Sequence, residues 1–153
     1  MTDHDHSAEI TTLNTLTATL FDSVTGYEDA AANLDGGHRL QELFRDRASE
    51  RRKVVENLRA EVRRLGGEPE DDGSFMGKTH QRFLDLKGAI TGRDEAAIIN
   101  EVERGEDYLK EKFETALNGG ELTGESRAAV ERALQSVRSG HDQVSALKHG
   151  LNA

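Results

Sequence analysis

The sequence contains no cysteine and only one proline, and both absences limit what the protein can be. Without cysteine there are no disulfides, no thiolate ligands for a metal and no cysteine nucleophile. One proline, 5% aromatic residues and 32% charged residues are typical of a well-solvated helical protein and not of a sheet-rich or disordered one. At 153 residues the chain has room for one domain with one hydrophobic core. The composition therefore predicts a single all-α domain.

Long apolar runs and basic clusters are also missing. No apolar run approaches the roughly 18 residues that a membrane span requires, and Met1 to Ser7 lack the basic and apolar regions of a signal peptide. We therefore expect a cytoplasmic protein with no membrane partner. A net charge of −9 would repel phosphate backbones, and no basic run interleaved with aromatic residues offsets it, so we expect no nucleic-acid partner.

Apolar residues recur at steps of three and four residues in four long stretches, which is the periodicity of amphipathic helices. The expected helices cover residues 7 to about 34, 40 to 65, 94 to about 117, and 123 to 151. Pairs of glycines follow the first three, and Thr123 is placed to cap the last. A shorter helix from Ser74 to about Ile90 is expected as a crossover. Residues 1–8 are expected to form a flexible tail before a domain over residues 9–151.

The order of these elements indicates how the helices connect. Two short hairpins joined by one longer connection give the connectivity of ferritin-like bundles, and simple up-down-up-down order is the alternative. Helices of roughly 25 to 30 residues are about 35 to 45 Å long, which suits nearly parallel axes. We therefore expect a ferritin-like four-helix bundle with a short helical crossover between the second and third long helices.

Each long helix places at least one ionisable residue on its apolar face. These residues are Glu28, Glu50, Glu103, Glu106 and His141. Because a buried unpaired carboxylate is costly, each would need a partner or a metal. We expect four of them, Glu28, Glu50, Glu106 and His141, to converge in a shared dehydrated interior.

Three glycines lie beside these polar residues, deep inside predicted helices. They are Gly26, Gly105 and Gly140. A helix-interior glycine costs roughly 0.5 to 1 kcal/mol relative to alanine, so its presence needs a reason. The glycines indicate either a bound ligand or close crossing of helices, and the sequence alone leaves both open.

Several runs of residues resemble a family of bacterial ferritin-like four-helix-bundle proteins of unknown function. The runs are Gly26-Tyr27-Glu28-Asp29, Ala48-Ser49-Glu50-Arg51, Thr79-His80-Gln81-Arg82 with Leu86-Lys87, Glu103-Arg104-Gly105-Glu106-Asp107 and His141-Asp142-Gln143-Val144. The similarity extends from about Thr11 to Leu147, and the Arg-Gly-Glu-Asp run is its most specific part. The resemblance implies a ferritin-like fold, and it implies no particular reaction because the family has no settled activity.

The wider ferritin-like superfamily holds two irons inside the bundle. A carboxylate comes from each of two helices, and a Glu-x-x-His motif comes from each of the other two. Glu28 and Glu106 match the single carboxylates. Glu50 matches the first member of one motif, and His141 matches the second member of the other. The sequence thus keeps part of this pattern.

Two of the six expected ligands are missing, however. Lys53 stands where one histidine belongs, and Arg138 stands where one glutamate belongs, for which only Glu103 is a nearby substitute. Arg47, Arg51 and Arg138 lie at angles comparable to those of the inward carboxylates, and a guanidinium can pair with a carboxylate without metal. By depth along the helices, Glu28 is close enough to pair with Arg47, and Glu106 with Arg138. The alternatives are an ion-pair network, a partial or mononuclear metal site, and a di-iron centre.

Two functions of different classes follow. The first is a non-catalytic, stress-associated or interaction bundle without a cofactor, for which a homodimer or another homo-oligomer is one arrangement. The second is a ferritin-like protein with oxidase or storage activity, in which Glu28, Glu50, Glu103, Glu106 and His141 hold iron. The two hypotheses make opposite predictions about iron, and neither assigns a catalytic residue.

Overall fold

The computed structural model describes residues 6–34, 38–70 and 95–151, and it places four α-helices in them. They are α1 (Ser7–Ala32), α2 (His38–Arg64), α5 (Glu95–Asn118) and α6 (Gly124–Leu151). No strand occurs within these three ranges, so the predicted all-α four-helix bundle is confirmed. The first helix begins at Ser7, inside the stretch expected to be a tail. The crossover helix predicted from Ser74 to Ile90 lies outside the described residues.

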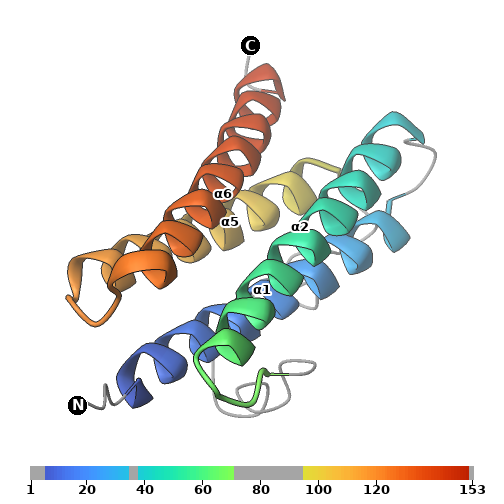
Figure 1. Ribbon diagram of the computed structural model, residues 1–153. Helices are drawn as coiled ribbons and strands as arrows, with labels where there is room; N and C mark the ends of the chain where they lie inside the picture. Colours follow the sequence, from blue (N-terminus) through green and yellow to red (C-terminus); the bar gives the residue numbers. More distant parts are fainter. Residues whose placement is uncertain (1–5, 35–37, 71–94, 152–153) are drawn as a thin grey trace.

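The helices form two antiparallel hairpins, α1–α2 and α5–α6, that pack side by side (Figure 1). Contacts between the hairpins join α1 to α5 and α2 to α6. The start of α1 meets the start of α6, where Glu9 accepts the backbone N–H of Thr123 at 3.1 Å. The two starts lie together, so α6 runs parallel to α1. Because each hairpin is antiparallel, α5 then runs parallel to α2. A simple up-down-up-down bundle would have these two helices antiparallel, so that alternative is wrong.

The core is filled by side chains from all four helices, in the three-and-four spacing visible in the sequence. The apolar side chains larger than alanine with 0% exposure are Leu13, Leu20, Tyr27, Phe44, Leu58, Val62, Ile98, Val102, Leu109, Phe113, Val130 and Val137. Each large apolar side chain contributes about 1.5–3 kcal/mol by leaving water. No helix in the described part of the chain is both long enough and apolar enough to cross a membrane.

The end of α2 shows why the Gly-Gly pair stops this helix. Gly66 has a φ of +88°, a backbone conformation that side chains disfavour. Its N–H donates to the carbonyl of Arg63 and that of Gly67 donates to Val62, both at 2.9 Å, which is the pattern of a Schellman motif. A Cβ on Gly67 would lie 2.8 Å from Ile10 of α1. The two glycines therefore end α2 and let its end pack closely on α1.

Two buried carboxylates hold the start of α6. Glu9 accepts hydrogen bonds from the N–H and the hydroxyl of Thr123, and Glu61 accepts one from the hydroxyl of Ser126 at 2.9 Å. Burial alone would raise the pKa of Glu9, but its hydrogen bonds with His6 and with the Thr123 backbone lower it. Negative charge is favoured beside a helix N-terminus. The sequence predicts that the Thr123 side chain caps α6, which would require its hydroxyl to accept a hydrogen bond from the first turn. In the structure this hydroxyl donates a hydrogen bond to Glu9.

Candidate functional site

One ion pair lies fully inside the bundle, between Arg51 of α2 and Glu106 of α5. Both side chains have 0% exposure, and Arg51 Nη2 lies 3.0 and 2.9 Å from the two carboxylate oxygens of Glu106. Arg51 Nη1 donates to the hydroxyl of Ser23 at 2.7 Å, and the hydroxyl of Tyr27 donates to Glu106. Ser23 and Tyr27 both belong to α1. These four residues, which we call the buried cluster, therefore join α1, α2 and α5.

The electrostatics of the buried cluster keep its charges in place. Burial alone would lower the pKa of Arg51, but the negative charge of Glu106 raises it above its ordinary value. Burial, and then the same carboxylate, raises the pKa of Tyr27 well above its ordinary value. The Arg51 guanidinium carbon also lies 5.6 Å from the centre of the Tyr27 ring, a favourable cation–π distance. The arginine stays charged and the phenol stays protonated, so both continue to donate to Glu106.

The fourth helix contributes Gly140 to this level of the bundle. A Cβ at this position would overlap Arg51 Nη2 and would lie 3.0 Å from Glu106 Oε2 and 3.3 Å from Arg47 Nε. α6 can pass the buried cluster only because residue 140 has no side chain. The neighbours of this glycine are side chains of the interior, whereas the sequence suggested a ligand or a close crossing of helix backbones.

A second ion pair lies at the edge of the buried cluster. Arg47 donates from Nη1 to Glu50 at 3.2 Å and from Nη2 to Gln143 of α6 at 2.8 Å. The Glu50 side chain is 40% exposed and also accepts the hydroxyl of Ser136. Two buried nitrogens, the Nε atoms of Arg47 and Arg51, have no hydrogen-bond partner in the described structure. Around the buried cluster, hydrogen-bond donors of the two arginines therefore exceed the acceptors. This excess of donors opposes the binding of a cation there.

The expected convergence of four polar residues in the interior is wrong for Glu50, whose side chain is 40% exposed, and for Glu28. The Glu28 side chain is 47% exposed and pairs with Arg52, which is 56% exposed. The inward position on this turn belongs to its neighbour, Tyr27, which follows Leu20 and Val24 along the apolar face of α1. Glu28 is turned away from the core by about 100°, the angle between successive helical residues.

The remaining candidate ligands are also held by local partners. Glu103 accepts a hydrogen bond from Lys148 of α6 at 2.8 Å. His141 lies with Nε2 2.6 Å from Asp107 and Nδ1 3.3 Å from Asp142. Of the five candidates, only Glu106 is fully buried. Within the described residues, no three His, Asp or Glu side chains lie together so that they could hold a metal ion.

The ion pair of His141 gives a testable pH dependence. Burial opposes protonation, but hydrogen bonds with Asp142 and Asp107 raise the pKa of His141 above its ordinary value. The stabilisation is therefore complete below about pH 6.5, the ordinary pKa, and is lost as pH rises through the folded value. Asp107→Asn is expected to lower the pKa of His141, measured from its ring-proton NMR shifts. Glu131→Gln, ten residues away on α6, should leave the titration unchanged, and an unaltered midpoint in Asp107→Asn would contradict the pair.

Two of the three arginines of the ion-pair alternative pair with candidate carboxylates, but the pairs suggested by depth, Glu28 with Arg47 and Glu106 with Arg138, are wrong. Arg51 pairs with Glu106 and Arg47 with Glu50. Arg138 instead pairs at the surface with Glu114, at 3.2 Å. The pattern of the sequence did not reveal Ser23, or that Tyr27 contributes a hydroxyl in addition to its ring. Their four-residue spacing places both on one face of α1, and that is the signal from which they could have been found.

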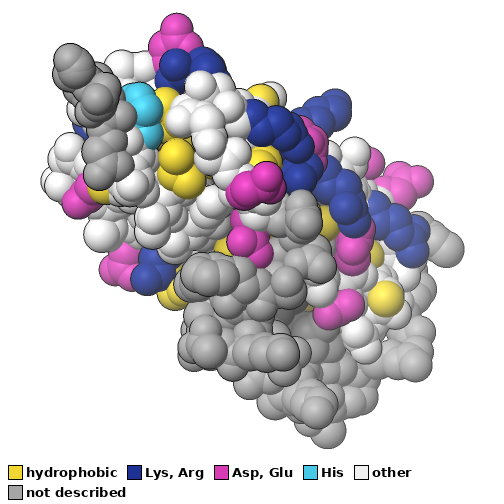
Figure 2. Space-filling view, turned by 60° about the horizontal axis from the view of Figure 1, so that its bottom comes forward, with side chains coloured by type: hydrophobic (Ala, Val, Ile, Leu, Met, Phe, Trp, Pro, Cys, Tyr) yellow, Lys and Arg dark blue, Asp and Glu magenta, His cyan; other side chains and the backbone are white. Residues whose placement is uncertain are grey.

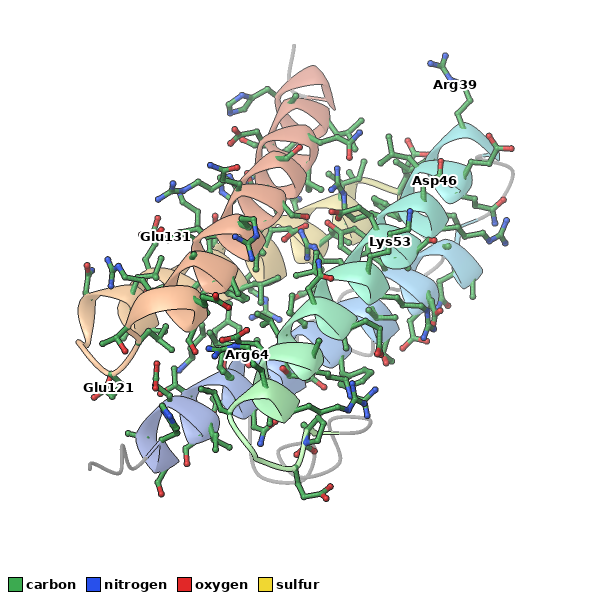
Figure 3. The ribbon with its side chains drawn as sticks, in the orientation of Figure 1. Arg39, Asp46, Lys53, Arg64, Glu121 and Glu131 are labelled. Atoms are coloured by element: carbon green, nitrogen blue, oxygen red, sulfur yellow. The ribbon has the colours of Figure 1, made fainter. Side chains whose placement is uncertain are left out.

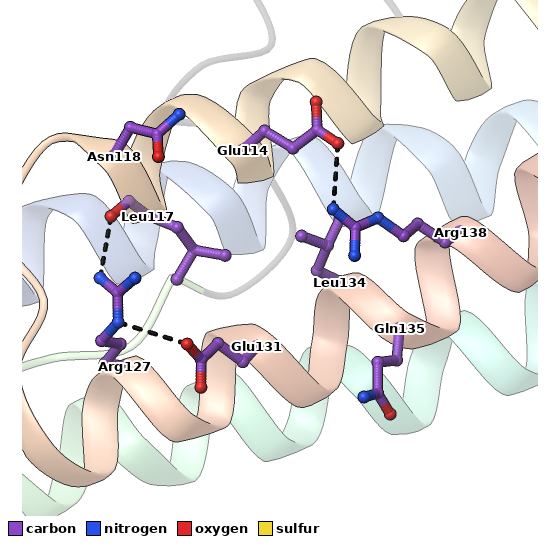
Figure 4. Close-up of a pocket in the computed structure, with 8 residues that line it drawn as sticks. All are labelled: Glu114, Leu117, Asn118, Arg127, Glu131, Leu134, Gln135 and Arg138. Atoms are coloured by element: carbon purple, nitrogen blue, oxygen red, sulfur yellow. Dashed lines mark hydrogen bonds and ion pairs between the residues drawn. The ribbon is translucent and has the colours of Figure 1, made fainter.

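A shallow groove of about 540 Å³ lies on the outer side of the α5–α6 hairpin (Figure 4). Its lining residues are Glu114, Leu117, Asn118, Arg127, Glu131, Leu134, Gln135 and Arg138. Arg127 donates to the carbonyl of Leu117 at 2.8 Å and pairs with Glu131 at 3.3 Å, while Arg138 pairs with Glu114. Both arginines of this groove are thus already paired within the protein.

These features define a class of protein: an all-α four-helix bundle whose interior holds an arginine–glutamate–tyrosine cluster. Residues 8–119 match the family described as a domain of unknown function, DUF2383, and because the match covers most of the chain, the protein belongs to this family. The matched range contains the whole buried cluster, whereas Gly140 lies beyond it. A comparison with curated proteins found no match.

Proposed function

We propose that this protein is a ferritin-like bundle that acts as a non-catalytic interaction protein of the cytoplasm, with a stress-associated role. The observation that carries the proposal is the contact of fully buried Arg51 with both oxygens of Glu106. Ferritin-like bundles direct carboxylates inward to hold metal, and a guanidinium supplies the positive charge here instead. The order of helix directions supports the ferritin-like part, because bundles with one long crossover share it.

In this proposal the buried cluster sets the register of the helices. Arg51 can reach its three partners only when α1, α2 and α5 stand at one relative height. Breaking a buried ion pair is strongly destabilising, whereas replacing the whole pair with apolar residues is often neutral. The cluster therefore favours one arrangement of the bundle over shifted ones more than it adds to overall stability.

Iron binding by Glu28, Glu50, Glu103, Glu106 and His141, with oxidase or storage activity, remains the alternative. Anaerobic loading with ferrous iron, followed by exposure to air, separates the two proposals. An interaction protein should retain no stoichiometric iron after desalting, and it should develop no oxo-bridged absorption band in the near ultraviolet. Elemental analysis and absorption spectra give the readout.

Two variants make the iron experiment decisive. Glu106→Gln removes the buried carboxylate charge, and Glu131→Gln removes an exposed one that is 53% accessible. A near-ultraviolet band that Glu106→Gln abolishes and Glu131→Gln retains would establish the iron alternative and end the interaction proposal.

A further inference from the structure

Charge is divided unevenly between the helices. α2 contains nine Lys and Arg against five Asp and Glu, whereas α1 contains four Asp and Glu and no Lys or Arg. Together, α2 and the adjacent α6 carry a net charge of +5, and α1 and the adjacent α5 carry −8. Lys and Arg side chains gather in a row on one face of the molecule (Figure 2). A chain with a net charge of −9 thus presents one basic pair of helices.

A groove of about 530 Å³ lies between these two basic helices. It extends from Glu50 to Arg64, which is about 20 Å along α2. Lys53 and Arg64 mark its α2 side in Figure 3. The lining residues are Glu50, Lys53, Val54, Asn57, Ala60, Glu61, Arg64, Ala129, Arg132, Ala133 and Ser136. Small side chains, including Ala129 and Ala133 of α6, line the groove, so the backbone of another helix can approach closely.

Two cations flank the groove at the same level. Glu50 of α2 contacts Ser136 of α6 across the groove, and the two helices are antiparallel. Three residues further along α2 is Lys53, which therefore faces the turn of α6 that contains Arg132. Both side chains belong to exposed residues, and neither has an ion pair or hydrogen bond within the described part of the chain. In the α5–α6 groove, by contrast, both Arg127 and Arg138 are already paired with carboxylates.

The carboxylates of the groove do not neutralise these two cations. Glu50 is held by Arg47 and Ser136, and Glu61 is held by Arg64 and Ser126. The unsatisfied charge at the groove is therefore positive.

We propose that the α2–α6 groove binds an acidic α-helix of a partner protein, whose carboxylates pair with Lys53 and Arg132. The length and the small lining residues suit a helix lying in a groove, and the two unpaired cations suit carboxylates on its inner face. Complementary charge also speeds encounter and selects among partners. This inference rests on the interaction role proposed above, and it names the surface and the kind of partner.

The test titrates the ¹⁵N-labelled full chain with a helical alanine-based peptide of about 18 residues that carries glutamates along one face. Saturable shifts are expected for the backbone amides of Val54, Ala129 and Ala133, and they should weaken as salt is raised. The double variant Lys53→Glu with Arg132→Glu is expected to bind at least about tenfold more weakly. The matched control, Arg39→Glu with Arg45→Glu, makes the same charge change outside the groove and should bind nearly as well as the unchanged protein.

Four outcomes would overturn the proposal. They are an absence of shifts, shifts on other faces of the bundle, equal loss of binding in both double variants, and equal binding of a peptide with glutamine in place of glutamate. Dimerisation of the protein alone in sedimentation velocity runs, abolished by Lys53→Glu with Arg132→Glu, would also overturn it, because the occupant would then be a second copy. Iron retention would defeat the proposed function itself, whereas a failed titration without iron retention would defeat only the groove.

Discussion

Glu106→Ala is expected to lower the free energy of unfolding by about 3–5 kcal/mol. The variant leaves Arg51 in the interior with its charge and without its carboxylate, and it also removes the acceptor of the Tyr27 hydroxyl. Arg51 cannot reach water without rearranging the bundle, because its side chain has 0% exposure. Urea denaturation, followed by circular dichroism at about 222 nm where helices absorb, measures this loss of stability.

Two controls separate burial from ion pairing. Glu28→Ala breaks an exposed pair with Arg52 and is expected to cost about 0–1 kcal/mol. Arg51→Met combined with Glu106→Leu replaces the whole pair with apolar side chains and should recover most of the stability lost in Glu106→Ala. A loss below about 1 kcal/mol in Glu106→Ala would mean that Arg51 finds another partner or reaches solvent.

Gly140→Ala is expected to destabilise the bundle by about 1–3 kcal/mol, although alanine is the better helix former by about 0.8–1.0 kcal/mol. The added methyl group would overlap Arg51 Nη2, and Arg51 cannot yield without giving up Glu106 or Ser23. Gly150→Ala is the matched control in the same helix, since nothing lies within 4 Å of its added Cβ. Thermal denaturation should show a lower midpoint for Gly140→Ala than for the unchanged protein. The midpoint of Gly150→Ala should not fall.

The cause of the Gly140→Ala effect can be tested in a second background. In a chain with Arg51→Met and Glu106→Leu, the guanidinium that the methyl group meets is gone, so the cost of Gly140→Ala should shrink. Such non-additivity is expected only for groups in contact. Additive effects would place the strain elsewhere in α6.

The helices could be predicted from the sequence because their signals are local. The spacing of apolar residues predicts where all four helices lie in the sequence. The Gly66-Gly67 pair predicts the end of α2, because its backbone geometry stops the helix. The polar interior was harder to predict. The apolar stripe of a helix is wide enough that Tyr27 and Glu28 both fall near its edge, and only packing against the other helices decides which one points inward.

The partner of each buried charge could not be read from the pattern. Arg51 and Glu106 are separated by 55 positions, and their contact depends on how α2 and α5 lie side by side. An arginine was among the expected partners of Glu106, but the depths estimated from the sequence matched it to Arg138 and not to Arg51. Gly140 was recognised as unusual for the interior of a helix, but what approaches it depended on Arg51 reaching across from α2.

Arg51 has a neighbour on every helix of the bundle: Ser23 and Tyr27 on α1, Glu106 on α5 and Gly140 on α6, in addition to its own α2. The surroundings of this one guanidinium therefore depend on the positions of all four helices. Displacement of any helix alters the surroundings of the same few nitrogen atoms. The side-chain ¹⁵N resonances of this single residue would consequently report any ligand or partner whose binding displaces one of the four helices.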